Sequence, residues 1–145
     1  MSSRISAERY HDISCGHRVV GHGGKCRLLH GHNYRIHFRV EANADQLDDL
    51  GMVLDFGVIK KTLCRWLEDT WDHRFLIWEE DPLLPALKEV SAESLVVIPF
   101  NPTAEQIANY LVEEVAPTLL EPYGCRLTHC RVEETRKCSA SAFVE

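Results

Sequence analysis

The sequence lacks several features that would each indicate a class of protein. It has no C-x-x-C pair, P-loop, dinucleotide-binding glycine motif, internal repeat or low-complexity tract. Residues 1–12 lack the apolar core of a signal peptide, and apolar runs are short, as at Leu95–Ile98. We therefore expect a cytoplasmic protein with no membrane span, and six cysteines that remain reduced thiols.

Basic residues are also in deficit. The chain has 16 Lys and Arg against 22 Asp and Glu, for a formal net charge of −6. This balance argues against nucleic acid or a membrane as a partner, although the basic residues Arg18, Lys25 and Arg27 could hold an anionic substrate locally. With 45% hydrophobic residues, residues 1–145 fit a single domain.

Apolar periodicity predicts two N-terminal strands. Residues 33–41 alternate strictly between apolar and polar side chains, as in a half-buried strand whose apolar side carries Tyr34, Ile36, Phe38 and Val40. Residues 5–15 form a weaker strand pattern, and the glycine-rich stretch 20–24 supplies a flexible connection. The two strands should pair antiparallel, which would bring His17 near His30-Gly-His32.

Two amphipathic helices and two further strands follow. Residues 55–71 carry apolar side chains every four positions, and a second helix begins at Thr103 and is limited near its end by Pro117. Short strands are expected at 126–135 and 139–144. The order ββααββ, with a loop-rich insert at 79–99, predicts an α+β fold whose four-stranded antiparallel sheet has open edges that oligomerisation could close.

The run Cys26-Arg-Leu-Leu-His30-Gly-His32 is the most informative motif. Histidines two apart on a strand point to the same face, so His30 and His32 can converge on one metal ion. The same parity places His37 on the polar face and excludes it. Three histidines with one open position form a catalytic zinc site. The third ligand remains to be chosen among the other histidines.

Cys26 has two interpretations. Four residues before His30, it could complete a Cys-His-His metal site, whereas its basic neighbours Lys25 and Arg27 favour a reactive thiolate. The other cysteines are expected to be small buried residues, including Cys15. They stand at positions 15, 64, 125, 130 and 138.

Carboxylates supply two further candidates. Asp72-His73 could form a general acid/base unit, or an exposed pair at a helix end. Alternation turns Glu134 toward the face that carries Cys130 and Val132. A buried carboxylate there could accept two adjacent N–H donors of a guanidine-like heterocycle, or form a structural salt bridge.

Taken together, these motifs resemble the family of 6-pyruvoyltetrahydropterin and 6-carboxytetrahydropterin synthases, which have the tunnelling fold. The resemblance implies that the catalytic groups are Cys26, Asp72 and His73. It further implies that Zn²⁺ is bound by His17, His30 and His32, and that the pterin ring is anchored by Glu134, with Thr103 and Glu105 near the pterin pocket. A helix cap and a first-turn acid would explain Thr103 and Glu105 equally well.

The resemblance also implies a reaction on 7,8-dihydroneopterin triphosphate in a hexamer made of two trimers. The four-residue step from Cys26 to His30 is similar to the bacterial queuosine-pathway type, which makes 6-carboxytetrahydropterin and acetaldehyde. The runner-up is a 6-pyruvoyltetrahydropterin synthase, and a rival of another class is a non-catalytic, zinc-stabilised pterin-binding module. Departures from the family pattern that could alter the pocket are Cys15-Gly16, Trp71, Ile77 and the insert 79–99.

Overall fold

A six-stranded sheet organises the protein. The computed structural model describes residues 3–145. Its strands lie in the order β4-β3-β1-β2-β5-β6. Neighbouring strands among β1, β2, β5 and β6 pair antiparallel, whereas β3 runs parallel to both β1 and β4. The strands are β1 (Arg4–His17), β2 (His30–Asn43), β3 (Arg74–Trp78), β4 (Leu95–Ile98), β5 (Leu127–Glu133) and β6 (Ser139–Phe143).

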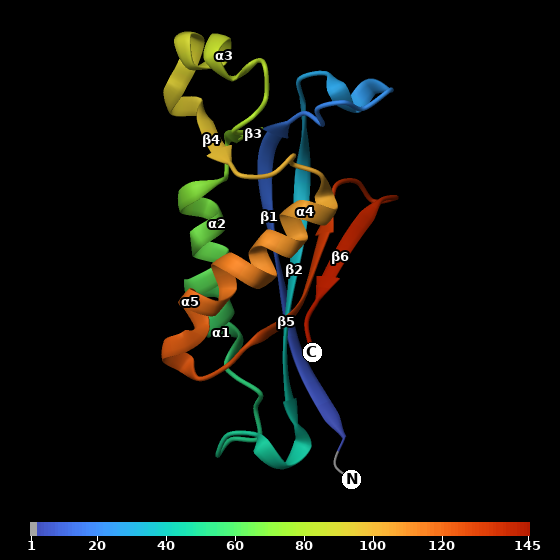
Figure 1. The fold of residues 1–145 in the computed structure, drawn as a ribbon. Coiled ribbons are helices and arrows are strands. Elements are labelled where there is room, and N and C mark those ends of the chain that lie inside the picture. Colours follow the sequence, from blue (N-terminus) through green and yellow to red (C-terminus); the bar gives the residue numbers. More distant parts are fainter. Residues whose placement is uncertain (1–2) are drawn as a thin grey trace.

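Two long helical segments cover one face of the sheet (Figure 1). The first consists of α1 (Phe56–Ile59), a π-helical turn (Lys60–Cys64) and α2 (Arg65–Thr70). The second consists of α4 (Ala104–Tyr110), a π-helical turn (Leu111–Val115) and α5 (Ala116–Leu120). A shorter helix, α3 (Leu84–Ser91), connects β3 to β4, and 3-10 turns occur at Lys25–Arg27, Ala44–Gln46, Ala92–Ser94 and Glu121–Tyr123. No helix within residues 3–145 has the length and apolar character to cross a membrane.

Strand alternation decides which side chains form the core. On β2, Tyr34, Ile36, Phe38 and Val40 are at most 1% exposed and pack against the two helical segments. Burying each large apolar side chain contributes roughly 1.5–3 kcal/mol to folding. The predicted α+β fold and the half-buried strand are therefore confirmed.

The opposite face of the sheet is polar. Arg35 binds Asp12 through two hydrogen bonds of 2.8 and 3.1 Å, and His37 Nε2 lies 3.1 Å from a carboxylate oxygen of Glu133. The prediction that His37 lies away from the other two histidines of β2 is confirmed.

The insert predicted to be loop-rich contains regular structure. β3 precedes it, and residues 79–99 contain α3 and β4, so the prediction of a four-stranded, wholly antiparallel sheet is wrong. β3 and β4 contain continuous apolar runs such as Phe75-Leu-Ile-Trp78, which show no alternation. In β3 the adjacent Leu76 and Ile77 are both buried, as is common for a strand in parallel pairs, whereas Val97 of the edge strand β4 is exposed.

Pro117 does not end the second helical segment, which continues to Leu120. It lies in the first turn of α5, directly after the π-helical turn, where a missing N–H is tolerated. The predicted start at Thr103 is confirmed, since its side chain accepts a hydrogen bond from the amide of Gln106 at 3.1 Å.

Replacing Gly31 should disturb the β1–β2 pairing. A Cβ at this position would lie 2.8 Å from the backbone oxygen of Cys15, so the two strands must shift. We expect Gly31→Ala to lower the free energy of unfolding by about 1–3 kcal/mol and to weaken metal binding. Thermal unfolding and a metal titration measure both effects. Gly23→Ala is the control, because a Cβ there meets nothing within 4 Å. Equal stability of the two variants would contradict the prediction.

Candidate functional site

Three histidines converge at the end of the β1–β2 hairpin. The antiparallel register places His17 opposite His30, and His32 follows two residues later on the same face. One ligand nitrogen from each histidine lies within 4.8 Å of the other two. The structure therefore brings together the two histidines of the motif and His17, a set that could hold a metal ion.

Backbone carbonyls orient two of these rings. His17 Nδ1 donates a hydrogen bond to the carbonyl of Pro102 at 2.7 Å, and His30 Nδ1 donates to the carbonyl of Leu28 at 2.7 Å. A carbonyl can only accept, so the Nδ1 atoms carry the protons and the Nε2 atoms keep their lone pairs. Metal-binding histidines usually donate their other ring N–H to a carbonyl or carboxylate in this way, which fixes the tautomer and the ring orientation.

Burial favours the neutral form of His17 and His32. It lowers the pKa of His17 from 6.5 to about 4, although the Pro102 carbonyl opposes the shift, and it also lowers the pKa of His32. The Nε2 atoms of His17 and His32 are buried without a hydrogen-bond partner among residues 3–145. Neutral imidazoles with unused lone pairs fit a divalent transition metal.

A third buried polar atom lies beside the cluster. Tyr34 is 1% exposed, and its hydroxyl finds no hydrogen-bond partner within residues 3–145. Its ring packs edge-on against His17 and His32, with centroids 5.7 and 5.3 Å apart. Burial, assisted by the negative charge of Glu134, raises the pKa of the hydroxyl, so it remains a protonated donor.

Glu134 faces the histidines. It follows β5 directly, and its two carboxylate oxygens lie 3.9 Å from His17 Nε2 and 3.8 Å from His32 Nε2. Its neighbour Glu133 projects to the polar face, where it contacts His37. The predicted inward orientation of Glu134 is confirmed.

Of the clefts beside the histidines, one is lined by Cys26 and another by Asp72. This Cys26 cleft has a volume of about 300 Å³ and is also lined by Thr103 and Glu105. Cys26 is half-buried and lies in the 3-10 turn between β1 and β2. Thr103 caps α4 and Glu105 is an exposed residue of its first turn, so both have the structural roles foreseen for them as well as a position in the cleft.

Asp72 and His73 line the other cleft, which has a volume of about 710 Å³. His73 Nδ1 donates to Asp72 at 2.8 Å, and the other oxygen of Asp72 accepts from the amide of Ser14 at 2.8 Å. Burial alone would raise the pKa of Asp72, but these two donors outweigh it and lower the pKa. His73 is 80% exposed and has a φ of 64°, a left-handed conformation uncommon outside glycine.

The two clefts place the predicted groups on different sides of the histidine cluster. Cys26 and His17 line the smaller cleft, Asp72 and His32 line the larger one, and Glu134 borders both. The Asp72–His73 pair is thus formed in the single chain, while its meeting with Cys26 stays a prediction.

The remaining cysteines divide by burial. Cys15 is buried and donates to the carbonyl of Trp71 at 3.2 Å, and burial, with the nearby charge of Asp72, raises its pKa to about 12. It is therefore a structural thiol. The prediction of burial also holds for Cys64 and Cys130, but it is wrong for Cys138, which is exposed in the turn between β5 and β6 and lines the Cys26 cleft.

Sequence reasoning missed the groups that orient the histidines. The carbonyls of Pro102 and Leu28 have no side-chain signature, so no motif could have indicated them. Tyr34 was assigned to the core from strand alternation. Its adjacency to the His-Gly-His motif, with a polar atom on an apolar face, was the signal available.

Tyr34→Phe should remove a buried hydroxyl that has no partner within residues 3–145. We expect the free energy of unfolding of the metal-free protein to rise by about 1 kcal/mol, because the cost of burying the hydroxyl disappears. Chemical denaturation measures this, with Tyr123→Phe as the control at an exposed tyrosine. A loss of stability in Tyr34→Phe would show that the hydroxyl has a partner in the folded chain.

The metal-free protein should lose stability in mild acid. The unfolded chain binds a proton at His17 near pH 6.5, whereas the folded chain binds it only near pH 4. The free energy of unfolding should therefore fall by about 3 kcal/mol from this residue as the pH drops through that interval. Denaturation at a series of pH values measures the slope. His17→Gln should lack this part of the slope, and an unchanged slope would contradict the assignment.

Comparisons with known proteins agree with this geometry. The model of the 6-pyruvoyl tetrahydropterin synthase family matches residues 5–145. The chain is 34% identical over 142 residues to a 6-carboxy-5,6,7,8-tetrahydropterin synthase of Rickettsia typhi, covering 97% of this chain and 99% of that protein. It is 37% identical over 118 residues to a probable 6-carboxy-5,6,7,8-tetrahydropterin synthase of Halobacterium salinarum, covering 81% of this chain and 73% of that protein.

Solved structures share the fold. An uncharacterized protein from Wolinella succinogenes superposes with a TM-score of 0.85 at 26% identity, covering 99% of this chain and 100% of that chain. A Plasmodium vivax 6-pyruvoyltetrahydropterin synthase superposes with a TM-score of 0.76 at 18% identity, covering 99% of both chains, and supports the tunnelling fold alone. The chain belongs to the 6-pyruvoyl tetrahydropterin synthase family.

Proposed function

We propose that the protein is a zinc-dependent lyase that converts 7,8-dihydroneopterin triphosphate and water to 6-carboxy-5,6,7,8-tetrahydropterin, acetaldehyde and triphosphate. The observation that carries the proposal is the cluster of three histidines, two of them buried or half-buried with free Nε2 atoms, beside a cleft lined by Cys26. Relatives named as 6-carboxy-5,6,7,8-tetrahydropterin synthases support the choice of product. The reaction belongs to queuosine biosynthesis in the cytoplasm.

His17, His30 and His32 would hold the zinc ion. When bound, it would supply Lewis-acid chemistry that acidifies the side-chain hydroxyls of the substrate and stabilises developing negative charge on oxygen. The carbonyls of Pro102 and Leu28 keep the imidazoles in the tautomer that this role requires.

Cys26 would move protons at the side-chain carbons of the substrate, since its thiol lies in the same cleft as His17. Glu134, 23% exposed and bordering both clefts, would anchor the pterin by accepting two adjacent N–H bonds. Thr103 and Glu105, on the wall of the Cys26 cleft, would contact the same ring.

Asp72 and His73 would complete the proton-transfer triad. The Nδ1–H of His73 is held by Asp72, so its Nε2 can take or release a proton. Because the pair lines a different cleft from Cys26, we propose that a neighbouring subunit brings the two together.

Open sheet edges support such an assembly. Within residues 3–145, β1 pairs with β3 only at Cys15 and Gly16, and the backbone of Ser14 is bound by Asp72 and His73. Residues 4–13 therefore offer a free edge, and β6 pairs with β5 alone. Joining these edges between subunits would close the sheets into a barrel and protect the strands from other pairing. A hexamer of two trimers is the proposed state.

Product analysis tests the reaction. Zinc-loaded protein is incubated with dihydroneopterin triphosphate and the products are identified by mass. We expect acetaldehyde with 6-carboxytetrahydropterin. Formation of 6-pyruvoyltetrahydropterin would instead identify a 6-pyruvoyltetrahydropterin synthase, and pterin binding without turnover would identify a binding module.

Cys26→Ser should abolish turnover while zinc stays bound. Loss of a positioned proton-transfer group costs about 100-fold or more in kcat. Metal analysis and pterin binding should match those of the unmodified protein, because the three histidines remain. Cys125→Ser is the control at a half-buried thiol that does not line either cleft. If Cys26→Ser loses zinc, the thiol is a metal ligand and the assigned role is wrong.

A further inference from the structure

We infer that Arg18, clamped by Asp81, is a positioning residue that holds the Cys26 segment, residues 21–28 of the connection between β1 and β2, against the histidine cluster. The inference rests on the proposed role of Cys26 and adds a function for the β3–α3–β4 unit, residues 74–98, which includes most of the insert 79–99.

The contact between the two side chains is bidentate and shielded. Arg18 Nε donates to Asp81 at 2.8 Å, and Nη2 donates to the other carboxylate oxygen at 2.6 Å. Asp81 is only 3% exposed, although it lies in the turn that follows β3. A buried carboxylate is costly without a partner, so Arg18 is fixed in one orientation.

The third nitrogen of the guanidinium reaches the Cys26 segment. Arg18 Nη1 donates to the carbonyl of Arg27 at 3.0 Å, one residue after Cys26. The amide of Val19, one residue after Arg18, donates to the carbonyl of Cys26 itself at 2.7 Å. Arg18 and its neighbour therefore bind two successive backbone carbonyls, those of Cys26 and Arg27.

The residues that follow β4 bind the same part of the chain. The side chain of Asn101, just beyond β4, accepts from the amide of Val20 and donates to its carbonyl, both at 3.0 Å. The next residue, Pro102, accepts from His17 at 2.7 Å. Contacts from positions 81, 101 and 102 thus hold the chain from His17 to Val20, where β1 ends and the Cys26 segment begins.

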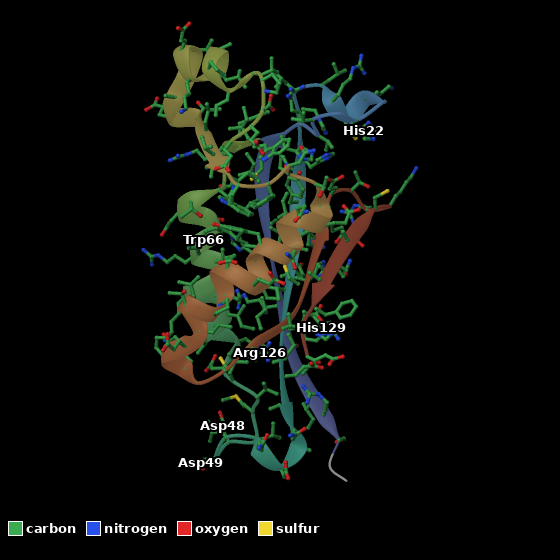
Figure 2. The ribbon with its side chains drawn as sticks, in the orientation of Figure 1. His22, Asp48, Asp49, Trp66, Arg126 and His129 are labelled. Atoms are coloured by element: carbon green, nitrogen blue, oxygen red, sulfur yellow. The ribbon has the colours of Figure 1, made fainter. Side chains whose placement is uncertain are left out.

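The connection between β1 and β2 and the β3–α3–β4 unit lie at the same end of the molecule (Figure 1). His22, on the same connection, projects at that end (Figure 2). The connection also contains Gly21, Gly23 and Gly24, and Gly21 has a φ of +86°.

A glycine-rich segment needs such a restraint. Glycine gives the unrestrained backbone many conformations, whereas a proton-transfer group must stay close to one position. The contacts of Arg18 restrict the backbone of the segment, because the planar guanidinium binds two carboxylate oxygens and a carbonyl at once. A lysine has one ammonium and cannot span all three.

Arg18→Lys tests the inference with zinc-loaded protein. Iodoacetamide alkylates both Cys26 and the exposed Cys138. Peptide mass spectrometry gives the alkylation ratio, which is the rate at Cys26 divided by the rate at Cys138. The variant keeps a charge beside Asp81 but loses the fork, so we expect the Cys26 segment to loosen and the ratio to rise about threefold or more. Turnover of dihydroneopterin triphosphate should fall about tenfold in kcat, with little change in KM or zinc content.

Leu120→Ala is the matched control for lost stability. Leu120 is fully buried at the end of α5, so this variant lowers the melting temperature without touching the clamp. Its alkylation ratio and kcat should equal those of the unmodified protein. Asp81→Asn, which keeps an acceptor for the amide of Leu83, serves if Arg18→Lys does not fold, and should raise the ratio in the same way.

An unchanged alkylation ratio in a folded clamp variant would reduce Arg18 to a structural residue and overturn the inference. The ratio requires no substrate, so it remains decisive even if the unmodified protein fails to turn over the proposed substrate. In that case the proposed function is wrong, and the alkylation ratio still tests the role of Arg18.

Discussion

The register of β1 against β2 is the constraint on which the site depends. It sets His17 opposite His30, and the same alternation that buries Tyr34 and Ile36 directs His32 toward the other two histidines. A slip by one residue would turn every side chain of one strand to the opposite face. The pairing that creates the core therefore also creates the histidine cluster, and neither can change without the other.

Burying polar groups beside this core has a cost that the fold offsets only in part. Carbonyls satisfy the Nδ1 atoms of His17 and His30, whereas two Nε2 atoms and the hydroxyl of Tyr34 lack a partner within residues 3–145. Unsatisfied buried groups are uncommon in folded proteins, and their gathering in one place is typical of a site that binds a ligand. Burial also lowers the pKa of His17 and His32, which keeps them neutral for a metal.

Sequence patterns predicted secondary structure correctly where one face of an element is polar. The alternation over residues 33–41 predicted the strand, the burial of Tyr34 and the exclusion of His37, and the cap at Thr103 located a helix start. The patterns failed for β3 and β4, because both consist largely of consecutive apolar residues and show no alternation. Cys138 was misjudged because residue type alone does not reveal a turn that faces a cleft.

The sequence by itself determined the chemistry of the site: a His-Gly-His pair on one strand face, a cysteine before it and an aspartate beside a histidine. Spacing within one strand or helix is local, so residue parity suffices to read it. Only the tertiary structure decided that Pro102 orients His17, that Asp81 clamps Arg18, and that Cys26 and Asp72 line separate clefts. These contacts join residues 63 and 85 positions apart and include a backbone carbonyl, so they depend on the path of the chain rather than on any local pattern.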